Sequence, residues 1–260
     1  MSTVRSILII FCLTIFIIVS IPIQGFLNIA NTKYKKRFPL FFYKSVKAII
    51  GLHIIKKNLD TSKDTGVSQG ILYVANHVSW FDIICLGSIL NARFIAKKEV
   101  ASMGIFGFLS TLSNTVYIDN ENKNRVVEYN KYINERLKNG ENFIIFPEGT
   151  TSDGNGVIQF KSSLLQCAID ENHSIKVQPI SICYSHKNNI KMGIYERRFV
   201  SWVGDTNMVQ AMKNFLLTGP VTVTILIHSF VSEDFFGDRK IITKYCQEKI
   251  LEGLNKTIKI

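Results

Sequence analysis

The sequence lacks the patterns that mark several large classes of protein. No histidine or cysteine stands at metal-ligand spacing beside a second His, Cys or carboxylate, so no metal site is expected. A G-x-G-x-x-G or P-loop pattern is also missing, which argues against a nucleotide cofactor. We recognise no nucleophile elbow, and this counts against a lipase or thioesterase that works through a serine. Without an aromatic RNA-binding motif or a recognition-helix pattern, nucleic acid is not an expected partner.

Cysteine and acidic residues are both scarce. The five cysteines are scattered and odd in number, and most stand in apolar runs, so we expect small buried hydrophobic residues in a reducing compartment. The 31 Lys and Arg residues outnumber the 20 Asp and Glu residues, which gives a net charge of +11. Such an excess favours anionic partners, namely a phospholipid surface, the phosphates of CoA or an acidic carrier protein.

Charge is absent between Arg5 and Lys33. Ser6–Ala30 is dominated by Ile, Leu, Phe and Val, and it is long enough to cross a bilayer core, which needs about 20 residues. A signal peptide is the competing interpretation, but an A-x-A-type cleavage site is missing and the apolar run is too long. We therefore expect this segment to anchor the chain in a membrane, either by spanning it or as a hairpin that dips into one leaflet.

Basic residues follow the apolar segment at once, whereas only Arg5 precedes it. The positive-inside rule then places the main domain on the cytoplasmic side, which suggests the inner membrane of a bacterium. Phe38–Ile55 mixes large apolar residues with sparse lysines, which suits a helix in the headgroup region and, nearly as well, an amphipathic helix packed on the core. Lys56–Gln69 is polar and predicts a surface connection. The 260 residues thus divide into a membrane anchor with an amphipathic helix, residues 1–55, and a main domain, residues 56–260.

The main domain alternates β-rich and helical runs. Short apolar runs bounded by polar turn residues predict strands, and longer amphipathic or apolar runs predict helices. This interleaving predicts the α/β class, with a sheet flanked by helices and the N-terminal segment as a helical membrane anchor. The expected strands are Gly70–Ala75, Arg93–Ala96, Thr115–Asp119, Asn142–Phe146, Lys176–Tyr184 and Val221–His228, and the expected helices are Phe81–Leu90, Asn122–Asn139, Ser162–Glu171, Asn207–Leu217 and Asp238–Lys256, with Met103–Ser113 either a helix or a loop.

His77 and Asp82 stand directly after the first of these strands. A neutral imidazole can take a proton from a hydroxyl when a carboxylate holds its other ring nitrogen. On one helix the two side chains would lie roughly 140° apart, so they meet only if His77 lies in the turn before a helix and Asp82 in its first turns. Ser79 is expected to be the N-cap of that helix. The alternative is a structural histidine beside a helix-capping aspartate.

The strand expected at Asn142–Phe146 also ends in polar turn residues, Pro147–Ser152. Two strands that deliver polar residues to one edge of a sheet are a common way to build an active site. We therefore expect the segment around Glu148 to form the wall that holds the substrate beside His77 and Asp82. The lack of a recognisable nucleophile elbow favours direct attack by a hydroxyl of the substrate over a covalent enzyme intermediate.

Three motifs in this order resemble those of the glycerolipid acyltransferase family, whose best-known members are the 1-acylglycerol-3-phosphate acyltransferases. They are N-H-x4-D at Asn76–Asp82, F-P-E-G-T at Phe146–Thr150 and V-Q-P-I at Val177–Ile180, within a resemblance that covers Leu72–Phe230. It implies transfer of a fatty acyl chain from a thioester of CoA or acyl-carrier protein to a free hydroxyl of a lyso-lipid. The donor is then a substrate, and no cofactor is expected. The favoured acceptor is 1-acyl-sn-glycerol 3-phosphate, which gives phosphatidic acid in phospholipid biosynthesis.

The resemblance also assigns roles to residues of this chain, and it makes residues 56–260 the catalytic domain. It implies His77 as the base and Asp82 as the partner that orients it. It places Glu148 and Gly149 in acceptor binding and Pro179 in a segment that shapes the site. The other residues of these motifs in the expected substrate-binding set are Asn76, Thr150 and Thr151.

The chain departs from the family at two positions where a cation is usual. The second motif usually reads F-I-D-R, but Asn120 stands where the arginine is expected. The third motif often reads E-G-T-R, but Thr151 takes the last position. Arginine is the stronger phosphate partner because its planar fork makes two charged hydrogen bonds. Both expected cations of a phosphate site are therefore neutral here.

Four other cations are candidates to contact an anionic substrate. Lys161 matches a lysine that commonly follows the third motif, and we expect it to contact the acceptor or its headgroup. Arg125 is a weaker substitute because it lies farther along the chain from Asn120. Lys97 and Lys98 match an A-K-x-E that the family usually carries here, and we expect them either to face the substrate or to form a solvated charge run.

Further stretches resemble the branch of the family that contains lyso-ornithine lipid acyltransferases: E-G-T-T-S-D-G at Glu148–Gly154, F-K-S-S-L at Phe160–Leu164 and W-V-G-D at Trp202–Asp205. Those enzymes acylate a hydroxyl on an amino-lipid without phosphate, so neutral Asn120 and Thr151 are consistent with that acceptor. A lyso-ornithine lipid is therefore the alternative acceptor. A non-catalytic lipid-binding protein of the membrane is the further alternative, supported only by the missing arginine.

Overall fold

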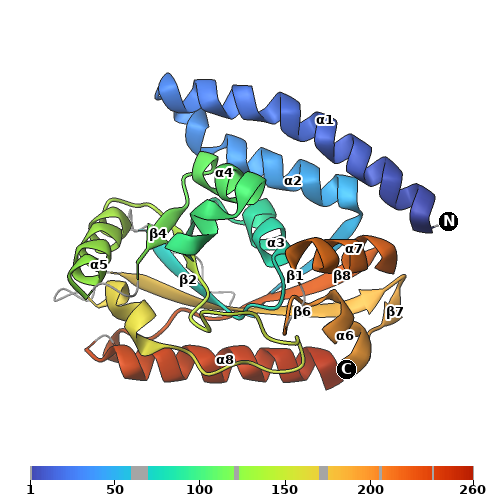
Figure 1. Ribbon diagram of the computed structural model, residues 1–260. Helices are drawn as coiled ribbons and strands as arrows, with labels where there is room; N and C mark the ends of the chain where they lie inside the picture. Colours follow the sequence, from blue (N-terminus) through green and yellow to red (C-terminus); the bar gives the residue numbers. More distant parts are fainter. Residues whose placement is uncertain are drawn as a thin grey trace.

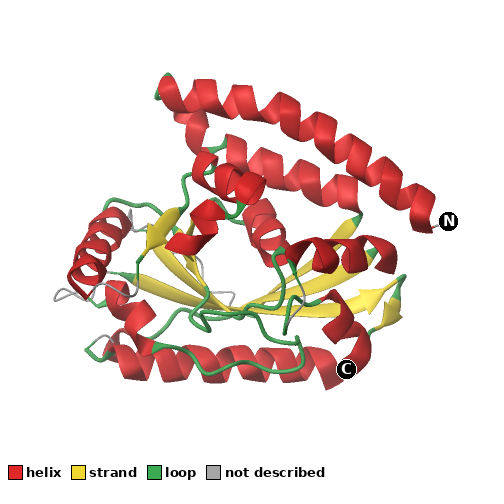
Figure 2. Ribbon diagram, in the orientation of Figure 1, coloured by secondary structure: helices red, strands yellow, loops and turns green. Residues whose placement is uncertain are grey.

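The computed structural model describes residues 2–59, 70–119, 123–169, 175–204, 207–235 and 237–259. Figures 1 and 2 show a central sheet with helices on both faces. Helix α8 (Arg239–Lys259) covers one face, α2 (Phe38–Ile50) and α3 (Phe81–Ile89) cover the other, and α1 (Ser2–Ile29) lies outside α2. The expected α/β class, with an apolar helical segment at the N-terminus, is confirmed.

The strands of the described chain form one sheet. They are β1 (Leu52–Asn58), β2 (Ile71–Ala75), β3 (Arg93–Lys97), β4 (Val116–Ile118), β5 (Phe143–Ile145), β6 (Lys176–Lys187), β7 (Ile190–Lys191) and β8 (Val221–Ile227). Their order across the sheet is β1-β8-β6-β2-β5-β3-β4, with β7 paired to β6. Neighbours are parallel, except that β6 runs antiparallel to β7 and β8. The carboxyl ends of β2 and β5 therefore meet at one edge.

The remaining helices are shorter than α1 and α8. They are α4 (Gly104–Leu112), α5 (Lys123–Lys138), α6 (Ile194–Val200), α7 (Met208–Thr218) and the short 3-10 helices η1 (Lys33–Lys36), η2 (Lys98–Ser102), η3 (Ser162–Ala168) and η4 (Glu233–Phe235). A 3-10 helix stands in place of the longer helix expected at Ser162–Glu171. Strand β6 continues past the expected end at Tyr184, and α6 was not expected from the sequence.

Strand β2 shows why an uninterrupted apolar run forms this central strand. Leu72 and Val74 are buried in the core on one face of the sheet, and Tyr73 and Ala75 are buried in the core on the other. Successive side chains of a strand point to opposite faces, so a strand covered on both sides is apolar throughout. Because β5 and β6 flank β2, its carboxyl end delivers His77 to the middle of the sheet edge.

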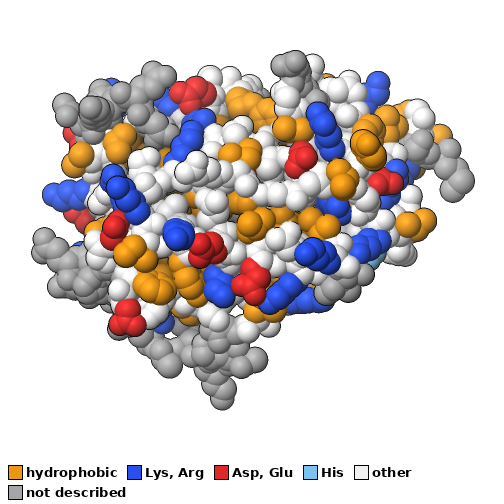
Figure 3. Space-filling view, turned by 90° about the horizontal axis from the view of Figure 1, so that it is seen from below, with side chains coloured by type: hydrophobic (Ala, Val, Ile, Leu, Met, Phe, Trp, Pro, Cys, Tyr) orange, Lys and Arg blue, Asp and Glu red, His pale blue; other side chains and the backbone are white. Residues whose placement is uncertain are grey.

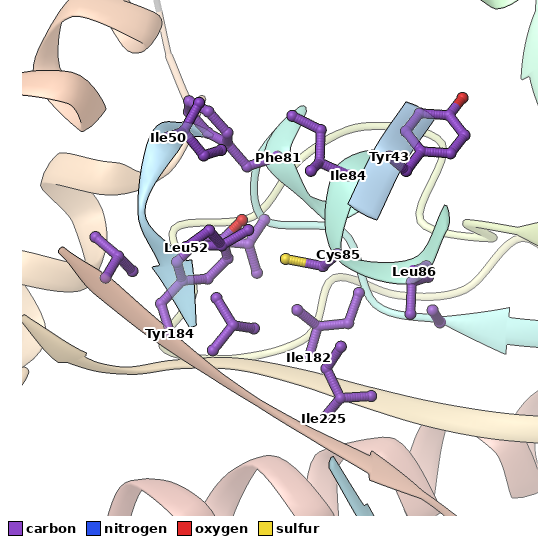
Figure 4. Packing of buried hydrophobic residues seen from close by; sticks show 14 of the residues in the cluster. Tyr43, Ile50, Leu52, Phe81, Ile84, Cys85, Leu86, Ile182, Tyr184 and Ile225 are labelled. Atoms are coloured by element: carbon purple, nitrogen blue, oxygen red, sulfur yellow. The ribbon is translucent and has the colours of Figure 1, made fainter. Parts of the chain in front are cut away.

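The core between the sheet and α3 is shown in Figure 4. Helix α3 is apolar on all sides and packs between α2 and the strands. Since the helix that begins just before Asp82 is enclosed in this way, its first turn has a defined place relative to β2. The labelled core residues are Tyr43, Ile50, Leu52, Phe81, Ile84, Cys85, Leu86, Ile182, Tyr184 and Ile225.

The helix expected over Phe38–Ile55 ends earlier than expected, at Ile50. Gly51 follows with φ 71°, the left-handed conformation that glycine adopts freely and that ends helices. The next residues form β1, which pairs with β8 along its whole length. The boundary expected between residues 55 and 56 thus falls inside a strand. Helix α2 buries Tyr43 and Val46, which agrees with the core-packing alternative. Residues 56–58 of the expected surface connection are also in β1, and residues 60–69 lie outside the described chain.

Helix α1 lies along α2 and also contacts α4 and α7 (Figure 1). Its inward stripe is partly polar, because Ser6, Ser20 and Gln24 are buried. Arg5 donates hydrogen bonds of 3.0 and 2.9 Å to backbone carbonyls near the ends of α7 and α2. The outward face is apolar. This distribution is the reverse of that found on a helix at the surface of a water-soluble domain.

Candidate active site

The structure brings His77 and Asp82 into contact. His77 lies in the loop after β2 and Asp82 in the first turn of α3, and the His77 Nδ1 to Asp82 Oδ2 distance is 2.8 Å. The expected geometry for the pair, a turn followed by a helix, is therefore present. The expected N-cap is wrong: α3 is preceded by Trp80, and no side chain caps it. Instead the Asp82 carboxylate accepts the backbone N–H of Val78 and Ser79 at 2.7 and 2.9 Å.

The Asp82 carboxylate is fully buried and surrounded by donors. Besides His77 and the two backbone N–H groups on Oδ2, the Tyr184 hydroxyl donates to Oδ1 at 2.8 Å. Burial, followed by the charge of Asp82, raises the pKa of Tyr184 well above 10, so the hydroxyl keeps its proton and donates. Together these four hydrogen bonds fix the position and orientation of the carboxylate. It can therefore hold the Nδ1–H of His77 and stabilise an imidazolium.

The His77 ring is held by its neighbours and remains partly open. It stacks on Phe146, with ring centroids 4.1 Å apart, and the His77 side chain is 18% exposed. The His77 backbone N–H donates to Glu148 Oε1 at 2.8 Å, and its carbonyl accepts the N–H of Ser152 at 2.7 Å. These contacts fix the ring while leaving Nε2 available to a substrate.

Glu148 joins the loop after β5 to the loop after β2. Its side chain is buried, and its second oxygen, Oε2, accepts the backbone N–H of Ile158 at 3.0 Å. Burial raises the pKa of Glu148 to about 7, against the opposite effect of its two N–H donors. Both oxygens of this carboxylate therefore accept hydrogen bonds from the backbone, and the one from the His77 N–H helps to position that residue. The expected role in acceptor binding remains a prediction.

We predict that Glu148 makes stability depend on pH. Its pKa is higher in the folded protein than its ordinary value of 4.5, so its contribution to stability is complete below pH 4.5 and is lost as the pH rises through about 7. The loss is on the order of 3 kcal/mol. Urea unfolding in detergent at pH 5 and pH 8 measures it, and the Glu148→Gln protein should lack this part of the pH dependence. Glu128→Gln, at an exposed position of α5, is the control expected to follow wild type. Equal pH dependence in all three proteins would contradict the prediction.

Gly149 lies in a tight turn beside Glu148, and Lys161 packs against this turn. Gly149 has φ 68°, and the Lys161 backbone N–H donates to the carbonyl of Pro147 at 2.8 Å. A Cβ on Gly149 would lie 3.1 Å from Lys161 Nζ, so the lysine side chain lies over the glycine. This brings Lys161 close to the loop that carries Glu148.

The Thr151 hydroxyl donates a hydrogen bond to the backbone carbonyl of Trp202. The backbone N–H of Trp202 in turn donates to the carbonyl of Val78 at 3.0 Å. The segment at Trp202 thus ties the loop of Thr151 to the loop of His77. Thr150 is exposed beside it.

Asn76 and Pro179 support the site from β2 and β6. Asn76 is fully buried, and its amide exchanges hydrogen bonds of 3.0 and 2.7 Å with the carbonyl and N–H of Ile182. Pro179 lies opposite Val74 in the register of β6 and β2. Asn76 thus ties the end of β2 to β6 next to His77, and the expected contact of Asn76 and Pro179 with substrate remains a prediction.

Two of the four cations expected near an anionic substrate, Lys98 and Arg125, lie beside Asp119. Lys98 Nζ lies 3.6 Å and Arg125 Nη1 lies 3.5 Å from Asp119 Oδ2, so two positive charges flank this carboxylate. Lys97 is exposed at the end of β3. Asn120, the neutral substitute for the motif arginine, lies outside the described residues.

Sequence reasoning missed two residues of this site, Tyr184 and Phe146. Phe146 stands inside the F-P-E-G-T motif, but nothing in the sequence places its ring against His77. Sequence reasoning also passed over the letters G-x-S-x-G at Gly66–Gly70, which precede β2, whereas a nucleophile elbow follows a strand and opens a helix. Among the described residues, no group of three or more His, Cys, Asp or Glu is placed to hold a metal ion.

Comparisons with known proteins show similarity to acyltransferases. A family model described as Acyltransferase matches residues 53–183. A lyso-ornithine lipid O-acyltransferase of Brucella abortus is 32% identical over 255 residues, which cover 96% of this chain and 93% of that protein. A 1-acyl-sn-glycerol-3-phosphate acyltransferase of Neisseria gonorrhoeae is 36% identical over 116 residues, or 45% of each protein. The crystal structure of the 1-acyl-sn-glycerophosphate (LPA) acyltransferase from Thermotoga maritima has the same fold, with a TM-score of 0.68 at 22% identity, covering 98% of this chain and 97% of that one.

Proposed function

This chain belongs to the acyltransferase family, and from that premise we propose that it moves a fatty acyl chain from a thioester to the hydroxyl of a lyso-lipid. The observation that carries the mechanism is the 2.8 Å contact between His77 Nδ1 and Asp82 Oδ2. Because Asp82 occupies Nδ1, the ring nitrogen left to accept a proton from the lyso-lipid is Nε2. The opening at the His77 side chain, which is 18% exposed, lets the hydroxyl reach it.

In the proposed reaction, the acceptor hydroxyl attacks the thioester carbonyl carbon while His77 Nε2 takes its proton. A C–O bond forms, the carbonyl oxygen becomes an oxyanion, and Asp82 stabilises the imidazolium. Collapse of the oxyanion breaks the C–S bond. The imidazolium then returns its proton to the departing sulfur, so the products are an ester and a free thiol.

A lyso-ornithine lipid is the first candidate for the acceptor. The relative of that name matches 96% of this chain, whereas the Neisseria 1-acyl-sn-glycerol-3-phosphate acyltransferase matches 45%. Thr151 stands where the family often has an arginine, and its hydroxyl donates a hydrogen bond to the carbonyl of Trp202. An amino-lipid without phosphate has no need of an arginine there, so the neutral residue fits this acceptor.

1-Acyl-sn-glycerol 3-phosphate, which would give phosphatidic acid, is the second candidate. The cations near the site favour it. Lys161 lies over Gly149, and Lys98 and Arg125 flank Asp119. A phosphate that bound at either place would be held by lysine or by an arginine outside the usual motif position.

We propose that the acyl donor is a thioester of CoA or of acyl-carrier protein and that the reaction uses no cofactor. The net charge of +11 supports both donors, since each is anionic. The donor acts as a substrate in this scheme, because its sulfur leaves with the proton that the acceptor gave up.

We place the protein on a membrane through α1. The helix is long and apolar enough to span a bilayer, although it lies against the domain. Because its outward side chains are apolar, burial in lipid would remove them from water, either across the bilayer or within one leaflet. The face opposite α1 differs, since Figure 3 shows Lys and Arg there among Asp, Glu and dispersed hydrophobic side chains. The large exposed side chains of α1 are Val4, Ile7, Leu8, Ile10, Phe11, Ile15, Ile18, Val19, Ile23, Phe26 and Ile29.

We propose that the catalytic domain lies on the cytoplasmic side of a bacterial inner membrane, and the basic residues after α1 support this side. They include Lys35 and Lys36, whereas Arg5 alone precedes the apolar run. A membrane location also suits the acceptor, because a lyso-lipid partitions into the bilayer.

A transfer assay tests the proposed function and orders its acceptors. Membranes that contain the protein receive labelled acyl-CoA or acyl-carrier protein, with lyso-ornithine lipid or 1-acyl-sn-glycerol 3-phosphate supplied separately. The expected result is labelled diacyl product from lyso-ornithine lipid, and none with His77→Ala protein. Product from the phosphate lipid alone would reverse the order of the acceptors. No product from either, with folded protein, would favour the non-catalytic lipid-binding alternative.

A further inference from the structure

A partly open cavity of about 100 Å³ lies at the junction of the N-terminal helices with the main domain. It is lined by η1, the start of α2, the end of α3, the start of β3 and the loops after α4 and α5. We call it the junction cavity. About 10–15 Å³ of such space is enough for one water molecule, so the cavity can hold a group larger than water. Its polar lining includes Lys35, Lys36, Arg93, Asn114, Glu141 and Asn142.

Positive charge exceeds negative charge around this cavity. Glu141 is the carboxylate of the cluster, and three cations share it. Arg136 contacts it at 2.6 Å through Nη2 and Lys36 at 3.0 Å through Nζ, while Arg93 Nε lies 3.4 Å away. Lys35, which also lines the cavity, donates to Asn31. The single negative charge of Glu141 therefore neutralises only one of the three positive charges around it.

Among the three cations around Glu141, Arg93 makes the longest contact with it. Its side chain is 18% exposed, and its 3.4 Å contact with Glu141 is longer than the 2.7–2.9 Å, approximately, of a good charged hydrogen bond. Burial lowers the pKa of Arg93, Glu141 raises it, and Arg136 lowers it again. A guanidinium carries five N–H donors. Arg93 lines the cavity, and the cations around Glu141 outnumber this one carboxylate, so the guanidinium favours a second anion.

The junction cavity is separate from the candidate active site. Arg93 and Leu72 both pair with Phe143, so the cavity adjoins the amino ends of β3, β2 and β5. His77 follows the carboxyl end of β2. The five residues of this strand, at about 3.3 Å each, separate the two places. An anion in the junction cavity is therefore distinct from an acceptor held at His77.

The cavity lies directly under the C-terminal end of α1. Asn28 donates to the carbonyl of Leu112 at 3.1 Å, and the cavity-lining Asn114 donates to Asn28 at 3.5 Å. At the same junction, Ile29 and Tyr34 are 88% and 53% exposed. Apolar surface that suits acyl chains thus adjoins a cationic hollow that suits a headgroup.

We propose that the junction cavity binds the phosphate group of an anionic phospholipid. The forked guanidinium of Arg93 and the ammonium of Lys36 contact the phosphate oxygens, and the acyl chains lie along the outward face near Ile29. Basic pockets beside membrane helices bind headgroups because they combine charge with a position at the bilayer surface. The bound lipid fixes the angle at which α1 meets the catalytic domain. This proposal goes beyond acyl transfer, because it concerns binding at the other end of the strands.

Thermal unfolding of the full-length protein in non-ionic detergent tests the proposal. The probes are dihexanoyl phosphatidylglycerol, dihexanoyl phosphatidylcholine and inorganic phosphate at equal concentrations. We expect phosphatidylglycerol to raise Tm most, because a ligand that binds only the folded state stabilises it by mass action. In Arg93→Gln protein the apparent Kd for phosphatidylglycerol is expected to rise about tenfold or more, since charged hydrogen bonds are lost. In Lys36→Gln protein this Kd is expected to rise about fivefold, a smaller change because the Lys36 side chain is half exposed.

Two further variants make the test specific. Lys44→Gln removes an exposed cation of α2 that does not line the cavity, and it is expected to change Kd by less than about twofold because solvent screens it. Arg93→Lys keeps the charge and is expected to recover part of the affinity. If Arg93→Gln does not fold, Lys36→Gln and Arg93→Lys still decide the outcome.

Other outcomes overturn the proposal. An equal response to inorganic phosphate would remove the lipid assignment and leave a site for free phosphate. Equal Kd values in Lys36→Gln and Lys44→Gln proteins would show general surface attraction in place of a site. Since the readout is binding, the experiment can be repeated in His77→Ala protein, so failure of this proposal and failure of the proposed function are distinguishable.

Discussion

Replacing His77 with alanine is expected to lower kcat by roughly 10²–10⁴-fold or more, the range typical for loss of a general base. The reason is the geometry of the ring. Asp82 holds Nδ1 at 2.8 Å, Phe146 stacks on one face, and Nε2 is left to take the proton of the acceptor. The hydrogen bonds of His77 to Glu148 and Ser152 are made by its backbone, so loss of the side chain should leave the fold and membrane binding in place. Initial rates of acyl transfer, with far-UV circular dichroism and membrane flotation, measure all three.

The matched control is His53→Ala. His53 is exposed on β1, far along the sheet from the loop after β2, so its loss should leave the rate within about twofold of wild type, as for surface substitutions in general. Wild-type turnover in the His77→Ala protein would remove His77 from the mechanism. Loss of folding in that protein would instead support the alternative of a structural histidine.

Replacing Asp82 with asparagine is expected to have the second large effect, a loss of about 10²–10⁴-fold in kcat with a smaller change in KM. Removal of the carboxylate partner of a catalytic histidine in serine proteases costs about 10⁴-fold. Here Oδ2 receives donors from His77, Val78 and Ser79, and the Tyr184 hydroxyl donates to Oδ1. An amide has only one acceptor oxygen, so its NH₂ group must face at least one of these donors, and it cannot stabilise an imidazolium as a charge does.

Tyr184→Phe separates this chemical effect from a packing effect. The substitution removes one hydrogen bond to Oδ1 and leaves the contact of Oδ2 with His77 in place. We expect it to cost about 0.5–1.5 kcal/mol of stability and less than about tenfold in kcat. Both variants need kcat, KM and urea unfolding. Equal losses of kcat in the two proteins would mean that Asp82 acts through the local structure and not through its charge.

The place of the candidate base could be predicted from the sequence because the spacing of His77 and Asp82 excludes a single helix. The apolar run Gly70–Ala75 predicted a strand before them, and polar residues at its end predicted an exposed edge. Each of these features is local: hydrophobic pattern, chain direction and helix geometry decide it within a few residues. The structure agrees, since β2 ends at Ala75 and α3 begins at Phe81.

The surroundings of this pair could not be predicted in the same way. Tyr184 reaches Asp82 from β6, and Phe146 covers His77 from the end of β5. Both contacts join residues that are far apart in the sequence, and they depend on which strands are neighbours. The prediction of a helix that continues to Ile55 was wrong for a related reason. The local apolar pattern is compatible with a helix or a strand, and pairing with β8 decided for the strand.

By itself, the sequence determined the α/β class, the apolar helix at the N-terminus, the order of the motifs and the turn-to-helix relation between His77 and Asp82. Only the tertiary structure decided that Glu148 spends both oxygens on backbone N–H groups, that α1 lies flat along α2, and that Arg93 and Lys36 share one carboxylate with Arg136. The physical reason is the separation in sequence over which each interaction acts. Helix periodicity and strand alternation act between near neighbours, whereas burial of a charge and the sharing of hydrogen bonds depend on segments that only the folded chain brings together.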